Sequence, residues 1–158
     1  MSKPFDAAVH ADAAAFAAVT LGVPGDLPVL VSEPVAWNVE YRFFVRHGAV
    51  VAGSVYFRHG ELVVDWQAPL AERDAAAVFA AQVLAQTKGT LRGGVVLDVG
   101  AIAGLGWAVV EANPAWASGL YGCDPESALL AVVASVCARA ESVGADAAFA
   151  RAVIVIET

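Results

Sequence analysis

Three short β-strand candidates in a row constrain the fold more than any other feature of this sequence. Residues 40–46, 49–57 and 61–66 are rich in β-branched and aromatic side chains. His47-Gly48 and His59-Gly60 separate them, and two-residue connections that end in glycine are typical of hairpin turns. A short apolar run at 27–31 is a further strand candidate. Residues 28–66 are therefore predicted to form an antiparallel meander.

Helix patterns flank the meander and follow it. Residues 11–19 are alanine-rich and are followed by Gly22 and Pro24, which end helices. Residues 70–86 carry apolar side chains at helical spacing. Asp124-Pro125 precedes a third candidate at 126–141, with an N-cap residue and a proline in the first turn.

Two more strands are expected at 95–99 and 107–111, joined by the segment GAIAGLG. Residues 144–158 stay ambiguous, since 145–152 favours a helix and 153–156 a strand. The predicted fold class is α+β, an antiparallel β-sheet with packed helices, in one domain that spans residues 1–158.

Composition excludes several functional classes. The 158 residues are 59% hydrophobic and 16% charged, which excludes disorder. The apolar runs at 99–110 and 128–138 are too short to cross a bilayer, and acidic residues near the N-terminus are unlike a signal peptide. A net charge of −7 argues against a nucleic-acid surface. We expect a soluble cytoplasmic protein without nucleic-acid or membrane partners.

Oxygen-bearing side chains interrupt the two oily strands at 95–99 and 107–111. If these strands pair as a hairpin, Asp98 falls near Glu111, and Asn113 lies on the same face as Glu111. Neighbouring carboxylates repel each other, and a hard cation relieves the repulsion. Mg²⁺ prefers oxygen ligands and is normally shared with substrate phosphates. Asp98, Glu111 and Asn113 are therefore candidate metal ligands.

The order Asp98, then Glu111-Ala112-Asn113 about a dozen residues later, resembles the metal-binding end of the ATP-grasp superfamily. The spacing is similar to that of the D-alanine–D-alanine ligases, and the loop from Pro114 to Gly119 is similar to the loop near their second substrate. The resemblance covers roughly residues 28–124. It implies ATP and Mg²⁺ as cofactors, with the three side chains holding Mg²⁺ against the phosphates.

A second region carries the same resemblance. The stretch from Glu33 to Ala36, which includes Val35, looks like the hinge that holds adenine, and Glu40, seven residues after Glu33, would take the ribose hydroxyls. The run Glu40-Tyr41-Arg42-Phe43-Phe44-Val45 looks like a motif of the ribosomal-protein glutamate ligases and tubulin tyrosine ligases. The resemblance makes Arg42 a catalytic candidate that meets the transferring phosphoryl group.

Side chains on the next strand are expected to face the acceptor. Ser54, Tyr56 and Arg58 alternate along it, which would place them on one face. The resemblance implies a ligase that phosphorylates a carboxylate of a small molecule or peptide and joins it to an amine.

The resemblance departs from the full pattern at the N-terminal side. The only lysines are Lys3 and Lys88, and Lys3 is the candidate phosphate ligand. A glycine-rich lid loop is missing, and Val96 stands where some ligases carry an arginine. The chain is expected to correspond to the C-terminal portion of the fold, apparently truncated at the N-terminus. Another copy or a partner would then supply the missing half.

Each functional interpretation has a structural alternative. Asp98 could cap a turn before Gly100, Lys3 could be a frayed terminal residue, and Glu40 with Arg42 could form a solvent-facing pair at a sheet edge. The alternative function is a non-catalytic domain of the same fold that binds a nucleotide or a protein.

Overall fold

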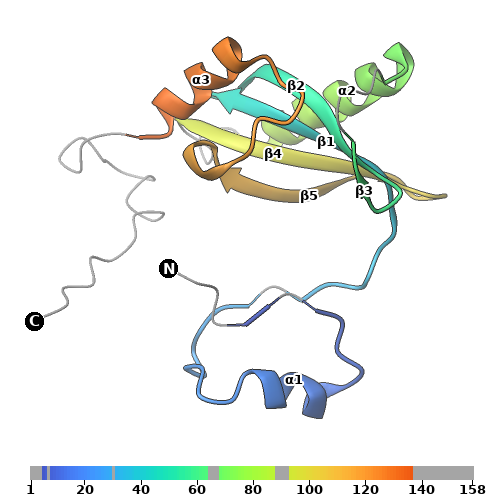
Figure 1. Cartoon of the computed structure of the whole chain (residues 1–158), viewed down its shortest axis with the longest axis vertical. Coiled ribbons are helices and arrows are strands. Elements are labelled where there is room, and N and C mark those ends of the chain that lie inside the picture. The colour runs from blue at the N-terminus through green and yellow to red at the C-terminus, as the bar shows by residue number, and fades with distance from the viewer. Residues whose placement is uncertain (1–4, 7, 30, 64–67, 88–92, 137–158) are drawn as a thin grey trace, which may run out of the picture. The chain divides into compact units, whose positions relative to one another are not determined.

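The computed structural model describes residues 5–6, 8–29, 31–63, 68–87 and 93–136. The chain divides into two compact units, residues 1–35 and residues 36–158. In the described part of the second unit, five antiparallel strands form one sheet in the order β3-β2-β1-β4-β5 (Figure 1). The strands are β1 (Trp37–Arg46), β2 (Ala49–Arg58), β3 (Glu61–Leu62), β4 (Gly94–Ile102) and β5 (Gly106–Pro114).

Two histidine-glycine turns produce the β1-β2-β3 meander. His47 and His59 each have a φ of 49°, and the glycines after them have φ values of 80° and 87°. This left-handed backbone at both central residues matches the twist of the flanking strands. The predicted antiparallel meander is confirmed for β1, β2 and β3.

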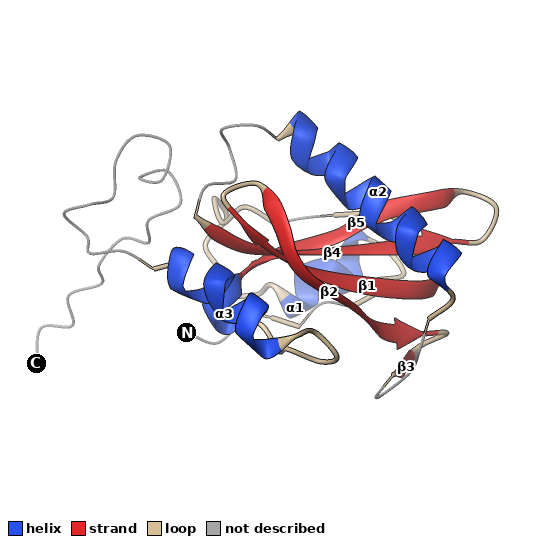
Figure 2. Ribbon diagram, turned by 90° about the horizontal axis from the view of Figure 1, so that it is seen from above, coloured by secondary structure: helices blue, strands red, loops and turns tan. Residues whose placement is uncertain are grey.

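Helices α2 (Leu70–Gln86) and α3 (Pro125–Ala134) cover opposite faces of the sheet, as Figure 2 shows. The Asp124 carboxylate caps α3 by accepting from the Ser127 amide at 2.8 Å, and Pro125 occupies the first turn. Helix α1 (Ala13–Val19) lies in the first unit, where Asp12 caps it by accepting from the Ala15 amide. The 3₁₀ helix η1 (Ala115–Ala117) follows β5.

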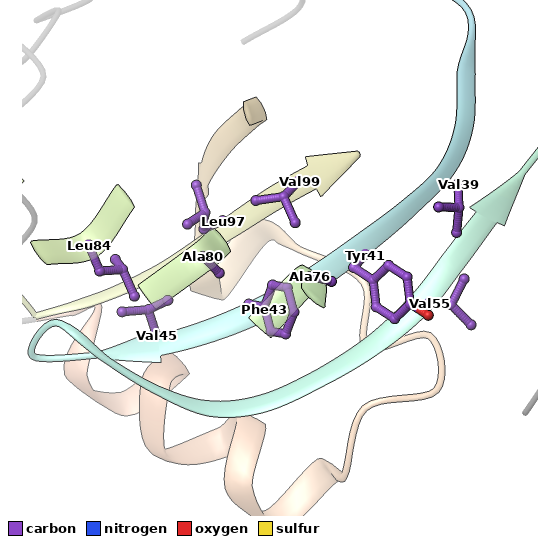
Figure 3. Close-up of a cluster of buried hydrophobic side chains, with 10 residues drawn as sticks. All are labelled: Val39, Tyr41, Phe43, Val45, Val55, Ala76, Ala80, Leu84, Leu97 and Val99. Atoms are coloured by element: carbon purple, nitrogen blue, oxygen red, sulfur yellow. The ribbon is translucent and has the colours of Figure 1, made fainter. Parts of the chain in front are cut away.

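Alternate residues of β1 enter two separate apolar clusters. The cluster on the α2 face, drawn in Figure 3, comprises Val39, Tyr41, Phe43, Val45, Val55, Ala76, Ala80, Leu84, Leu97 and Val99. The cluster on the α3 face comprises Phe44, Ala52, Val96, Ala115, Cys123, Ala128 and Ala131. The even-numbered residues of β1 from 40 to 44 therefore share a face with α3.

Glycine permits a very close approach of α3 to β4. A Cβ atom at Gly94 would lie 1.7 Å from the carbonyl oxygen of Ala131, a distance at which atoms overlap. Helix α3 can therefore occupy its position against the sheet only because residue 94 has no side chain.

The structure confirms the α+β class and corrects some element boundaries. The described residues of the predicted strand at 27–31 are not in a strand, since Pro28 lacks an amide donor and no neighbouring strand pairs with them. Strand β3 ends at Leu62 and α3 at Ala134, whereas the sequence predicted 66 and 141. The predictions for residues 144–158 lie outside the described residues. Within the described residues, no helix has the length and apolar character needed to cross a membrane.

Candidate functional site

Strand register brings four predicted site residues onto the α3 face of the sheet. Arg42 of β1 is the direct partner of Asp98 on β4, and Asp98 is the direct partner of Glu111 on β5. Glu40 lies two residues before Arg42 on the same face and pairs with Gly100. Three adjacent strands thus present three carboxylates and one guanidinium side by side.

Arg42 and Asp98 form a buried ion pair. The Arg42 Nε donates to Asp98 Oδ1 at 2.9 Å, and Nη2 donates to Oδ2 at 2.6 Å. Their side chains are only 7% and 0% exposed. Burial raises the pKa of Asp98, the bonds from Arg42 lower it, and the charge of Glu111 raises it again; the net direction is upward. The two-bond geometry provides strong, oriented pairing.

Glu40 is buried as well, and Tyr56 of β2 is its hydrogen-bond partner. The Tyr56 hydroxyl donates to Glu40 Oε2. Burial raises the pKa of Glu40, the Tyr56 bond lowers it, Asp98 and Glu111 raise it, and Arg42 lowers it, with a net upward direction. Glu40 is therefore an acceptor inside the sheet face and not a member of a solvent-facing edge pair.

The loop between η1 and α3 is attached to the same guanidinium. Arg42 Nη1 donates to the Gly119 carbonyl at 3.1 Å. The Arg42 Cζ lies 4.8 Å from the ring centre of Tyr121 and 5.1 Å from that of Tyr56. The two rings stack on each other, with centres 4.9 Å apart. Tyr121 has a φ of 49°, an unusual left-handed backbone for a residue that is not glycine, and its side chain is half-exposed.

A bulge in β5 determines where Glu111 points. Val99 pairs with Val109 but Asp98 pairs with Glu111, so Val110 is an extra residue in β5. Without it, Glu111 would face the α2 side together with Val109. Asn113 pairs with Val96 and lies on the same face as Glu111, one position further from Asp98 than Glu111 is. Glu111 is exposed and Asn113 is half-buried.

The donor set fits a magnesium ion in charge and chemistry. Glu40, Asp98 and Glu111 exceed the charge of Arg42, and Mg²⁺ is usually held by one or two carboxylates together with waters and phosphates. In the described part of the chain, no three histidine, cysteine or acidic side chains form a complete metal cage. Asp98 and Glu111 are thus the pair that could share a cation with a ligand, and their metal role stays a prediction.

Arg58 lies on the opposite face from the one expected. It pairs with Val39 in the β1–β2 register and forms an ion pair at 2.6 Å with Glu72 of α2. A register irregularity between Glu40 and Tyr41 breaks the alternation along β2. The prediction that Arg58 faces the acceptor together with Ser54 and Tyr56 is therefore wrong.

The predicted cofactor segment is exposed. Glu33 and Val35 belong to the first unit and Ala36 opens the second, and all three have exposed side chains. The next ring, that of Trp37, packs on Gly100: a Cβ there would lie 2.5 Å from it. Gly100 pairs with Glu40, so this ring adjoins the carboxylate expected to take ribose. Lys3 lies outside the described residues.

Comparison with protein families decides which proteins this chain is related to. A family described as an ATP-grasp domain, the second family of its clade, matches residues 1–131. The chain belongs to this ATP-grasp family. Searches of the curated proteins and of the solved structures give no significant match. ATP-grasp domains generally bind ATP and belong to ATP-dependent ligases, so the resemblance found in the sequence is confirmed at the family level.

Sequence reasoning missed several contacts of the ATP-grasp site. Tyr56 was expected on this face from its alternation with Ser54, but its bond to Glu40 was not. The contacts of Tyr121 and of the Gly119 carbonyl with Arg42 had no signal in the sequence. These contacts depend on a loop that returns to the sheet about 80 residues after Arg42, a spacing that local patterns do not reveal.

Proposed function

We propose that this ATP-grasp domain catalyses an ATP-dependent carboxylate–amine ligation. A substrate carboxylate oxygen attacks the γ-phosphorus of ATP and ADP leaves, which gives an acyl-phosphate. An amine then attacks the acyl carbon, and inorganic phosphate leaves as the amide forms. The observation that carries this proposal is the row of Arg42, Asp98 and Glu111 across three neighbouring strands.

Magnesium and the phosphates would meet at Asp98 and Glu111. The excess negative charge of this face repels a bare nucleotide, and a divalent cation would convert the repulsion into attraction. The cation supplies charge neutralisation for the phosphates when it is bound. Asn113 would contribute an amide oxygen near the exposed end of the site. Glu40 would accept the ribose hydroxyls, and the segment from Glu33 to Ala36 would border the adenine.

Arg42 has donors left for an anion. Its bonds to Asp98 and Gly119 use three of its five N–H groups, which leaves one on each terminal nitrogen. A guanidinium held in place by an ion pair and two rings costs little reorganisation when charge develops on a phosphoryl group. Arg42 is thus proposed to stabilise the transferring phosphoryl group.

Glu111→Gln gives the sharpest test of this site, because Glu111 is exposed and its loss does not break the buried ion pair. We expect calorimetry to measure ATP binding by the wild-type chain that depends on Mg²⁺. Glu111→Gln should weaken binding at least about tenfold in Mg²⁺, in line with the loss of one ligand. Asp74→Asn, an exposed acid on α2, is the matched control and should bind like the wild type.

Two further measurements separate the reaction from binding alone. Hydroxylamine traps acyl-phosphates as hydroxamates, so ADP release in the presence of mixed carboxylic acids should yield a hydroxamate. Binding of ATP that does not depend on Mg²⁺ or on Glu111 would contradict the site. Mg²⁺-dependent binding without ADP release, with every carboxylate and amine mixture tried, would contradict the ligase reaction.

One observation favours a second candidate, a non-catalytic nucleotide-binding domain. The Asp98 carboxylate is occupied at both oxygens by Arg42, an arrangement that also serves as a purely structural pair. The candidate predicts that Asp98→Asn lowers the stability of the fold but leaves ATP affinity unchanged. Loss of Mg²⁺-dependent affinity in a folded Asp98→Asn chain would exclude it.

A further inference from the structure

Tyr56 links two groups of the proposed nucleotide site through different parts of its side chain. Its hydroxyl donates to Glu40, while its ring lies against the guanidinium of Arg42. Tyr56 itself is 8% exposed, so the surrounding chain fixes its position. Both partners lie on the neighbouring strand β1, two residues apart on one face.

We propose that Tyr56 is a positioning residue of the nucleotide site, which orients Glu40 through its hydroxyl and Arg42 through its ring. This inference rests on the proposed function, in which Glu40 accepts the ribose hydroxyls. The Tyr56 bond engages Oε2 of Glu40, which directs Oε1 toward a ligand. Without the hydroxyl, the buried carboxylate would rotate to find another partner, since a buried acceptor without a donor is costly.

The protein contains a matched control for Tyr56 on the other face of the sheet. Tyr41 is 2% exposed, and its hydroxyl donates to Glu72 at 2.7 Å. Tyr41→Phe and Tyr56→Phe therefore each remove one hydroxyl from a buried tyrosine that donates to a glutamate. A purely structural role predicts the same consequences for both variants, whereas the proposed role predicts a difference in ribose recognition.

The experiment compares the affinities of the full chain for Mg-ATP and Mg-2′,3′-dideoxy-ATP by calorimetry. Wild type should prefer ATP at least about tenfold, because hydrogen bonds to a charged acceptor are strong. Tyr56→Phe should reduce this preference to about threefold or less by weakening ATP and sparing the dideoxy nucleotide. Tyr41→Phe should keep the wild-type preference. Tyr56→Leu, which also removes the ring from Arg42, should weaken both nucleotides further.

Several results would overturn the inference. Equal weakening of both nucleotides in Tyr56→Phe, or complete loss of binding in a folded Tyr56→Phe chain, would indicate a general structural role. Wild type that binds ATP but does not discriminate would refute the ribose role of Glu40 and leave ATP binding intact. Wild type that binds neither would refute the proposed function as well. Should Tyr56→Phe fail to fold, Glu40→Gln replaces it, and an unchanged preference there would overturn the inference.

Discussion

Arg42 is the side chain on which most contacts of the α3 face converge. It joins β1 to β4 through Asp98 and to the loop before α3 through Gly119. The rings of Tyr56 and Tyr121 cover its guanidinium. A residue with this many partners is expected to affect both stability and ligand binding, and the two effects need separate measurements.

Breaking the buried pair from one side should be strongly destabilising. Arg42→Met leaves the Asp98 carboxylate buried without its cation, and we expect a loss of about 3–5 kcal/mol in the free energy of unfolding. The double variant Arg42→Met with Asp98→Leu removes both charges and should recover most of this loss. Urea unfolding of both variants and of wild type checks the difference. A double variant less stable than Arg42→Met would contradict this account.

The positions of the site residues were predictable from the sequence in part. Alternation placed Glu40 with Arg42, and the hairpin placed Asp98 opposite Glu111, although the bulge at Val110 was needed to bring Glu111 to that face. The pairing of Arg42 with Asp98 was not predictable, because it follows from β4 adding beside β1 across about 55 residues of chain. Long-range strand order leaves no local pattern in the sequence.

Individual elements were more predictable where local signals were strong. Helix α2 has the predicted ends, and the cap of α3 is the predicted Asp124. The run at 27–31 was misassigned because a strand needs a pairing partner, which an apolar pattern alone cannot supply. Capping and turn chemistry act over a few residues, whereas strand pairing depends on the whole sheet.

The contact between α3 and β4 should tolerate no side chain at residue 94. Gly94→Ala would place a methyl group on the Ala131 carbonyl, so α3 must move away from the sheet. We expect a loss of about 3 kcal/mol or more in unfolding free energy. Gly25→Ala, where no atom lies within 4 Å of the new methyl, is the control and should leave stability nearly unchanged. Thermal unfolding monitored by circular dichroism measures both variants, and equal melting temperatures would refute the prediction.

The cap of α3 should make stability depend on acidity. Its bonds from Ser127 hold the pKa of Asp124 below the ordinary value, so the ionised form is favoured in the folded chain. This contribution is present above the unfolded pKa and is lost as pH falls below about 4. Asp124→Asn keeps a capping oxygen without the titration. The wild-type stability advantage should therefore shrink as pH falls from about 5 to about 3, and a constant difference would contradict this prediction.

Across the whole molecule, both apolar clusters and the site network lie between Val39 and Ala131. A chain that begins at Ala36 should therefore keep the fold of the second unit, with an unchanged urea midpoint for that transition. ATP binding should weaken, because the proposed contributions of Lys3, Glu33 and Val35 are removed. Failure to fold would mean that residues 1–35 are needed for the core. Unchanged affinity would mean that these three residues do not contact the nucleotide.

Partners and cellular location remain predictions at this scale. The expected carboxylate and amine substrates, association with a second copy or with a partner, and a cytoplasmic location all await measurement. Light scattering of the purified chain with and without Mg-ATP reports the state of association directly.

The division of β1 between two faces has an evolutionary consequence. Odd-numbered residues build the packing against α2, and even-numbered residues carry Glu40 and Arg42. A single-codon deletion within the strand would exchange the two sets, sending charges into oil and phenylalanine into the site at once. Descendants of this gene can therefore change β1 by substitution, but gaps of one residue should be absent from it.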